Sequence, residues 1–165
     1  MASRESRARG ELFDKLCYWG QQLSTATILF HQAVADHLGL NPTDHKCAGF
    51  LLTRGPMSAG ELAEATCLTT GAVTGVIDRL EKAGFVKRAD DPNDRRRVIV
   101  CAVPQRISEI ARLFEDLVAE MAELSSHYTN AELATILDFM SRSCDGLHAA
   151  TRKLRRREKS ADKST

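Results

Sequence analysis

The chain has 165 residues, a formal net charge of +1 at neutral pH and a hydrophobic fraction of 43%. This hydrophobic fraction predicts a folded chain, whereas an aromatic content of 5% argues against a large stacking platform for single-stranded nucleic acid. The sequence has no apolar run of about 18 residues, so we expect no transmembrane helix, and we recognise no signal peptide.

Five cysteines lie far apart in the sequence, at Cys17, Cys47, Cys67, Cys101 and Cys144. They form no Cys-x-x-Cys pair and no Cys/His cluster with zinc spacing. Because disulfide frameworks belong to oxidising compartments, this pattern predicts a reduced, cytoplasmic chain. We expect no disulfide, no metal site and no cofactor.

The charges are unevenly distributed along the chain. Residues 68–106 carry eight Lys/Arg against five Asp/Glu, residues 107–150 carry two against eight, and residues 151–165 carry seven against two. A near-neutral protein can therefore present two basic surfaces that bind phosphates. The second of these, around Arg152 to Arg157, is either a set of phosphate contacts or a solvated helix end that complements the helix dipole; we favour the helix end.

The first part of the chain predicts two helices. Apolar residues at three- and four-residue steps predict a long helix over 11–38, which Gly39 ends. A short helix over 44–54 follows, for which Thr43 or Asp44 is the expected N-cap.

A helix-turn-helix pattern comes next. Ser58 begins a helix, and Glu61 three residues later completes an S-x-x-E capping box. Thr69 or Thr70 then caps a helix over 70–83.

The remaining elements are two strands and two long helices. Short β-like runs predict strands over 85–89 and 97–103. Amphipathic patterns predict helices over 105–127 and 131–156, the second capped by Asn130. The fold class is therefore mostly α with a small β-hairpin (α+β).

The helix over 70–83 has an apolar stripe and an opposite face of small residues. The stripe consists of Val73, Val76, Ile77 and Leu80. The opposite face and the start of the helix carry Thr69, Thr70, Gly71, Thr74 and Gly75. Threonines can hydrogen-bond to bases or contact a thymine methyl, and free N–H groups at a helix start can bind phosphate. We expect this helix to enter the DNA major groove with modest base specificity, because it exposes no Arg or Asn there.

The hairpin after this helix is strongly basic. Its turn, residues 91–94, has the sequence Asp-Pro-Asn-Asp, which favours a turn at every position. Arg95, Arg96 and Arg97 follow, and an arginine on such a tip can enter a narrow minor groove. Asp94 can pair with a neighbouring arginine and orient it. A helix followed by a basic hairpin is the pattern of a winged helix-turn-helix domain, which predicts double-stranded DNA as the partner.

The run LTTGAVTGVIDRLEKAGFVKRADDPNDRRRVIV resembles the MarR family (multiple antibiotic resistance regulators), including its D-x-R wing motif at Asp94 and Arg96. The order of elements over 11–156 is similar as well. The resemblance implies a homodimeric regulator, most often a repressor, that binds a pseudo-palindromic operator. It also implies release by a small phenolic or lipophilic ligand. By position, Arg96 would enter the minor groove, and Asp78 and Arg79 would support the helix and the wing.

This interpretation also divides the chain into regions. Residues 41–104 form the winged helix-turn-helix domain, 11–40 and 105–156 form a helical dimerisation region, and 1–10 and 157–165 are flexible termini. We expect a homodimer because the long terminal helices cannot all bury their apolar stripes on one small central domain.

The resemblance places the ligand between the dimerisation helices and the winged domain. It implies a pocket whose candidate lining residues are Tyr18, Trp19, Phe30, His31 and His45. An ordinary core role is the simpler interpretation of each.

Cys17 suggests an alternative signal. Leu16-Cys17-Tyr18 resembles the context of the reactive cysteine in peroxide-sensing relatives, so a redox-sensing regulator of the same family is the alternative function. However, Gln21 and His31 stand where those relatives carry tyrosines that hydrogen-bond to the thiolate. This difference favours a structural cysteine.

Two other classes of protein fit the sequence less well. An enzyme finds little support, because the sequence has no nucleophile elbow, phosphate-binding loop or zinc-protease motif. A winged helix used for protein contacts would not need three adjacent arginines in its wing. We therefore expect a DNA-binding regulator and no catalytic residues.

Overall fold

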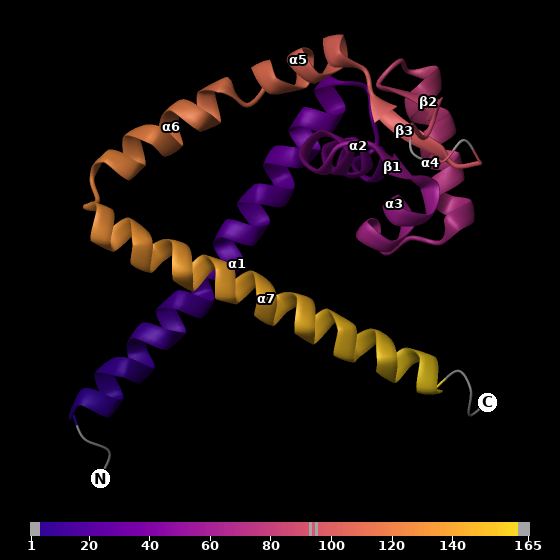
Figure 1. Cartoon of the computed structure of the whole chain (residues 1–165). Helices are drawn as coiled ribbons and strands as arrows, with labels where there is room; N and C mark the ends of the chain where they lie inside the picture. Colours follow the sequence, from indigo (N-terminus) through magenta and orange to yellow (C-terminus); the bar gives the residue numbers. More distant parts are fainter. Residues whose placement is uncertain (1–3, 93, 95, 162–165) are drawn as a thin grey trace. The chain divides into compact units, whose positions relative to one another are not determined.

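The computed structural model describes residues 4–92, 94 and 96–161, which are mainly helical with one three-stranded sheet (Figure 1). The expected fold class is confirmed. The chain divides into two units, Met1–Phe114 and Glu115–Thr165. In the described part of the chain, no helix combines the length and the apolar character needed to cross a membrane.

The first unit begins with two helices, α1 (Arg4–His37) and α2 (Pro42–Arg54). Helix α1 therefore starts earlier than the expected residue 11. The expected caps of α2, Thr43 or Asp44, are wrong: Asn41 Oδ1 accepts from the Asp44 N–H at 2.9 Å and is the N-cap. A proline at the first helical position is compatible with this earlier start.

The helix-turn-helix consists of α3 (Ala59–Thr66) and α4 (Thr70–Lys82). The capping box is confirmed: Ser58 Oγ accepts from the Glu61 N–H, and the Glu61 carboxylate accepts from the Ser58 N–H. Thr69 caps α4, since its hydroxyl oxygen accepts from the Ala72 N–H at 3.2 Å. Both caps satisfy backbone donors that a helix start leaves free.

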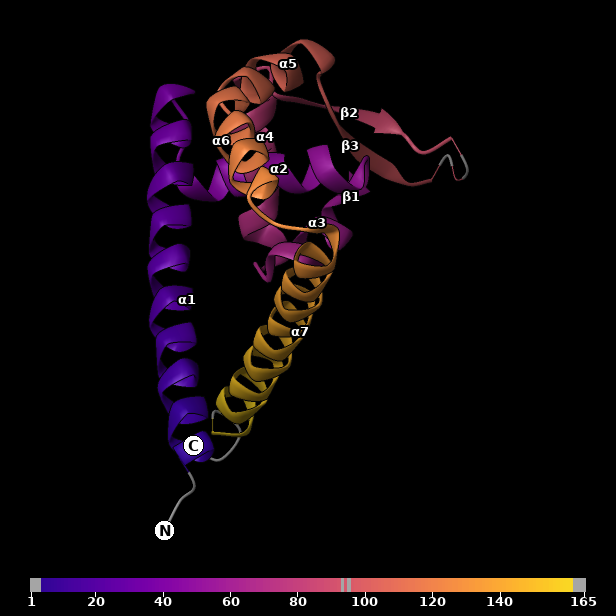
Figure 2. The ribbon, with the colours of Figure 1, turned by 90° about the vertical axis from the view of Figure 1, so that its left-hand side faces the viewer.

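The sheet contains β1 (Met57–Ser58), β2 (Val86–Asp90) and β3 (Val98–Ala102), in the antiparallel order β1-β3-β2. Strands β2 and β3 correspond to the two predicted strands, with bounds that differ by one residue at each end. Strand β1 was not predicted, because two residues are too few to show an alternating pattern. Figure 2 shows the β2–β3 hairpin extending away from the helices of the first unit. We call this hairpin, with its turn over 91–97, the wing.

One hydrophobic core holds the first unit together. It draws on α2, α3, α4, α5, β2 and β3. Its fully buried members include Cys47, Leu62, Val73, Val76, Ile77, Leu80 and Val100. The predicted stripe of α4 is thus confirmed as its buried face.

The expected continuous helix over 105–127 is wrong, because the chain forms α5 (Pro104–Arg112) and α6 (Glu115–Ser126) instead. The N–H groups of Leu113 and Phe114 bond three residues back, to Ile110 and Ala111, and this tighter pattern ends α5. Phe114 also packs edge-on against Phe30 of α1 at 5.1 Å. Hydrophobic periodicity continues across this break, so it gave no signal.

The second unit contains α6 and α7 (Asn130–Ala161), and the helix cap of α7 differs from the expected one. Thr129, not Asn130, is the cap. Glu132 N–H donates to Thr129 Oγ1 at 3.3 Å, and Thr129 N–H donates to the Glu132 carboxylate at 2.8 Å. This is a second reciprocal capping box.

Candidate nucleic-acid interface

The exposed face of α4 is made of small side chains whose hydroxyl groups are partly engaged. Thr70, Gly71 and Thr74 are exposed, and Gly75 is half-buried. Thr74 Oγ1 donates to the Thr70 carbonyl at 3.0 Å, so its lone pairs and methyl group are what it offers outward. Thr69 Oγ accepts from the helix and keeps its hydroxyl hydrogen for another acceptor. The face can therefore lie close to DNA but carries no cation of its own.

An ion pair fixes α4 to the start of α2. Arg79 Nε and Nη2 donate to the two carboxylate oxygens of Asp44 at 2.8 and 2.7 Å. The Asp44 side chain is 3% exposed, and Asn41 Nδ2 also donates to it at 2.8 Å. Bidentate pairing of this kind fixes orientation as well as distance. Sequence reasoning assigned Arg79 a supporting role but gave no indication of Asp44 as its partner.

A second set of ion pairs joins α4 to β2 of the wing. Arg88 Nη2 lies 2.5 Å from Asp78 Oδ1, and the same guanidinium pairs with Glu81. The Arg88 N–H also donates to Glu81 Oε1 at 3.1 Å. Asp78 thus contacts the wing directly, through an arginine that the sequence did not single out.

The wing tip is a tight turn closed by backbone bonds. Asp91 N–H donates to the Arg97 carbonyl at 2.9 Å, and Arg97 N–H donates to the Asp94 carbonyl at 2.9 Å. Asp94 Oδ1 accepts from the Arg96 N–H at 3.0 Å, so this aspartate orders the backbone of Arg96. The Arg96 side chain is exposed, and no ion pair within the described residues engages its guanidinium. Arg95 lies outside the described residues.

Arg97 contacts the protein itself. Its guanidinium pairs with Glu61, donates to Ser58 Oγ at 3.2 Å and lies 3.7 Å from Asp91 Oδ2. Arg96 and Arg97 are therefore not equivalent, a distinction for which the sequence carries no signal.

Three of the candidate pocket residues lie together in the first unit. His31 Nδ1 and His45 Nε2 are 3.2 Å apart, and the Phe30 ring packs against His31. Phe114, which was not predicted, contacts both Phe30 and His31. We call these four residues the aromatic cluster. His45 is buried, and its Nδ1 atom has no hydrogen-bond partner among the described residues.

The other α1 candidates lie apart from this cluster. Tyr18 and Trp19 contact each other edge-on at 5.4 Å and are 54% and 66% exposed. Cys17 is an exposed free thiol, and nothing in the described part of the chain provides it with a cation or hydrogen-bond donor. Activation of a thiolate needs such a partner, so nothing here favours the redox alternative.

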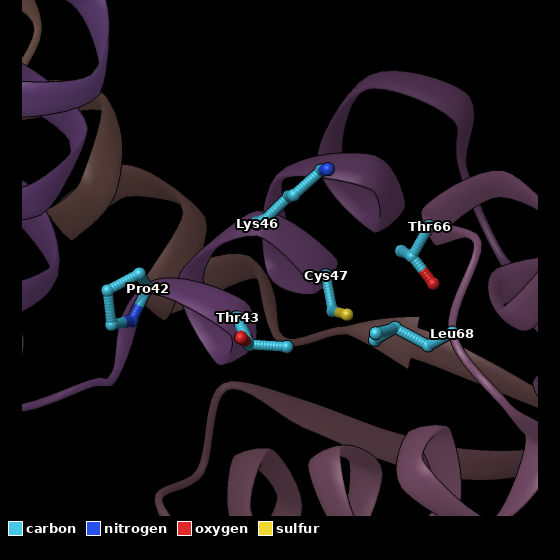
Figure 3. Close-up of a pocket in the computed structure, with 6 residues that line it drawn as sticks. All are labelled: Pro42, Thr43, Lys46, Cys47, Thr66 and Leu68. Atoms are coloured by element: carbon cyan, nitrogen blue, oxygen red, sulfur yellow. The ribbon is translucent and has the colours of Figure 1, made fainter. Parts of the chain in front are cut away.

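A cavity of about 210 Å³ lies between α2 and the segment joining α3 to α4 (Figure 3). It is lined by Pro42, Thr43, Lys46, Cys47, Thr66 and Leu68. Burial, and next the Asp44 carboxylate, raises the pKa of the Cys47 thiol to about 11. This thiol is therefore neutral and packs as a small apolar group. No sequence pattern indicated this cavity.

The family is decided by comparison with known sequences. The sequence profile of the MarR family matches residues 40–98. Over 155 residues the chain is 43% identical to the uncharacterized HTH-type transcriptional regulator YcgE of Bacillus subtilis, a match covering 94% of this chain and 99% of that protein. The chain belongs to the MarR family. This MarR-family protein is a DNA-binding transcriptional regulator.

Solved structures of two other proteins, MarR and NadR, share the fold of this chain. Wild-type apo MarR from E. coli has a TM-score of 0.56 at 20% identity, covering 77% of this chain and 94% of that chain. NadR in complex with 4-hydroxyphenylacetate has a TM-score of 0.57 at 20% identity, covering 73% and 86%. At these identities the likeness establishes the fold, and the winged-helix prediction is confirmed.

The aromatic cluster predicts a pH dependence of folding. Burial, and then the neighbouring His31, lower the pKa of His45 below its ordinary value of about 6.5. The His45 imidazole is therefore protonated at a higher pH in the unfolded chain than in the folded chain. The contribution of His45 to the free energy of unfolding should be constant well above pH 6.5 and should fall as the pH drops below it.

Urea denaturation from pH 8 to pH 5 at one protein concentration measures this dependence. His45→Leu should flatten the profile, whereas His148→Leu, at an exposed position of α7, should leave it unchanged. An equally steep profile in His45→Leu would show that another group is responsible.

Proposed function

We propose that this MarR-family protein is a cytoplasmic, homodimeric repressor that binds a pseudo-palindromic operator and leaves it when a small phenolic or otherwise lipophilic molecule binds. The observation that carries the proposal is the combination of two features in one unit. One is the cation-free, small-residue face of α4, and the other is a wing whose Arg96 guanidinium has no ion-pair partner among the described residues. The first feature fits the major groove and the second the minor groove.

The proposed contacts divide between bases and phosphates. Thr70, Gly71, Thr74 and Gly75 would lie against the base edges, where threonine accepts hydrogen bonds or contacts a thymine methyl. Thr69 would donate its free hydroxyl hydrogen to a phosphate near the helix start. In the wing, Asp94 orders the backbone that presents Arg96, and Arg95 is a further candidate outside the described residues. With the contacts divided in this way, most of the affinity for DNA would come from the wing and from the contacts with phosphates.

The homodimer is supported by large apolar side chains that the single chain leaves exposed. On α1 they are Leu12, Phe13, Leu16, Trp19, Leu23, Ile28 and Leu29. On α6 and α7 they include Val118, Met121, Leu124, Leu137, Phe139, Met140 and Leu147. Exposed apolar surfaces of this extent are typical of interaction sites. We therefore propose that α1, α6 and α7 pack against a second copy, as expected for 11–40 and 105–156.

The ligand is supported by the aromatic cluster. The buried His45 Nδ1 lacks a partner among the described residues, which is costly unless a bound group supplies one. Phe30 and Phe114 offer apolar ring contacts beside it. NadR, which has the same fold, binds 4-hydroxyphenylacetate, a phenol with a carboxylate. Both of these groups could hydrogen-bond to an imidazole.

Release from DNA would follow from the position of His45. It is the neighbour in sequence of Asp44, whose carboxylate holds Arg79 of α4. A molecule inserted against His45 would displace the first turn of α2. Through the Asp44–Arg79 pair, that displacement would reach the recognition helix.

The DNA interface can be tested with an operator selected from random duplexes. Arg96→Ala should weaken operator binding roughly tenfold or more, because it removes a minor-groove cation from each subunit. The slope of log K against log salt should decrease by about one per arginine removed, hence by about two per dimer. Fluorescence anisotropy over a range of salt concentrations measures both. Unchanged affinity in Arg96→Ala would contradict the wing assignment, and Arg112→Ala on α5 serves as a charge-matched control.

The dimer predicts a sedimenting mass of about twice the 18.2 kDa of the chain at micromolar concentration. Leu137→Glu places a charge on the proposed α7 interface and should shift the population to monomers. Gln21→Glu on α1 adds the same single negative charge at an exposed polar position and should remain dimeric. A wild-type monomer in analytical ultracentrifugation would contradict the proposal.

The ligand site predicts that some phenols or aromatic carboxylates release the labelled operator. A panel that includes 4-hydroxyphenylacetate and salicylate can be titrated against the complex by anisotropy. For any compound that releases the wild type, His45→Leu should bind operator normally but resist release, since the imidazole is removed. His148→Leu should respond as the wild type does. Equal release from His45→Leu would show that the ligand binds elsewhere.

A further inference from the structure

We infer that Arg97 is a positioning residue of the wing: its guanidinium braces the hairpin against the start of α3 and makes no phosphate contact. The inference rests on the proposed function, because it concerns how the wing is aimed at DNA. It separates Arg97 from the DNA-contacting role that its neighbour Arg96 is proposed to have.

The contacts of Arg97 connect three segments. Its guanidinium pairs with the Glu61 carboxylate in the first turn of α3 and donates to Ser58 Oγ, the N-cap of that helix, at 3.2 Å. It also lies 3.7 Å from Asp91 Oδ2, on the other arm of the wing. Asp91 and Arg97 are joined by a backbone bond of 2.9 Å as well. Both arms are thus tied to α3 through one side chain.

We call the contacts of Arg97 with Glu61, Ser58 and Asp91 the brace. The brace lies at the point where the wing extends beyond strand β1. Strand β1 pairs with β3 at two positions, Ser58 with Ile99 and Met57 with Val100. Beyond Ile99 towards the tip, β3 has its backbone partners on β2 alone. Arg97 stands two residues beyond that last pair and replaces the missing strand contact with side-chain contacts. A hairpin without such support would pivot about the end of β1.

The Glu61 carboxylate takes part in two sets of contacts, the capping box of α3 and the ion pair with Arg97. Its carboxylate accepts from the Ser58 N–H and hydroxyl, which completes the capping box, and it pairs with Arg97. Arg97, and then the Ser58 backbone, lower the pKa of Glu61 to about 2. The carboxylate therefore remains ionised at any pH at which the protein would be assayed. The brace is permanent rather than switched by pH.

The exposure of the pair indicates what it contributes. The Arg97 and Glu61 side chains are 42% and 48% exposed. Ion pairs this exposed add little to global stability. The consequence of losing the brace should therefore be a mobile wing on an otherwise intact fold.

The experiment compares Arg97→Ala, Glu61→Gln and the double variant on the selected operator over a range of salt. Glutamine keeps the capping box while removing the charge. Each single variant should weaken binding by about fivefold, and the double variant should be no weaker than either, because both remove one shared contact. The salt slope should stay at the wild-type value in all three. Arg96→Ala, measured alongside, should lower that slope.

A lower salt slope in Arg97→Ala, with losses that add to those of Glu61→Gln, would overturn the inference and make Arg97 a phosphate contact. Failure of the wild type to bind any selected duplex would overturn the proposed function instead. Hydrogen exchange separates the two cases without DNA. The Asp91 and Arg97 amides should exchange faster in Arg97→Ala, while those in the α4 core remain protected. Unchanged wing exchange would also overturn the inference.

Discussion

The rest of the site depends on one constraint, the complete burial of one face of α4. Val73, Val76, Ile77 and Leu80 are at most 2% exposed and pack into the core of the first unit. A rotation of the helix by one residue would bring polar groups into that core, so the stripe fixes which face remains outside. Thr69 at the start and Arg79 near the end fix the position of the helix along its axis. The small-residue face is exposed as a consequence of this packing.

The cations around this helix are mostly committed to the protein itself. Arg79 pairs with Asp44, Arg88 pairs with Asp78, and Arg97 pairs with Glu61. The Arg79 pair joins α4 to α2, the Arg88 pair joins α4 to β2, and the Arg97 pair joins the wing to α3. Arg96 is left as an exposed arginine whose guanidinium no described carboxylate engages. Counting basic residues along 68–106 therefore overstates the charge available to phosphates. The acidic partners of these arginines explain how a near-neutral chain can still present a cationic tip.

Much of this architecture could be predicted from the sequence, because local chemistry determines it. The capping box at Ser58, the cap at Thr69 and the stripe of α4 depend on residues within a few positions of each other. The features that were missed depend on distant partners or on elements too short to show a pattern. Glu61 and Arg97 meet only after the hairpin folds back on α3. At the break before α6, Phe114 packs on Phe30, which is distant in the sequence, while the apolar periodicity runs on unchanged.

The composition of α4 has a consequence for specificity under the proposed function. A recognition face of threonines and glycines offers few bidentate contacts, so each half-site would be read weakly. Discrimination between the operator and other DNA sequences must then come from features that both subunits read together. These are the shape of the minor groove at the two wings and the spacing of the two half-sites. Both depend on rigid geometry more than on individual base contacts. A regulator of this kind needs its wing held firmly, which is the role that the ion pairs of Arg88 and Arg97 can fill.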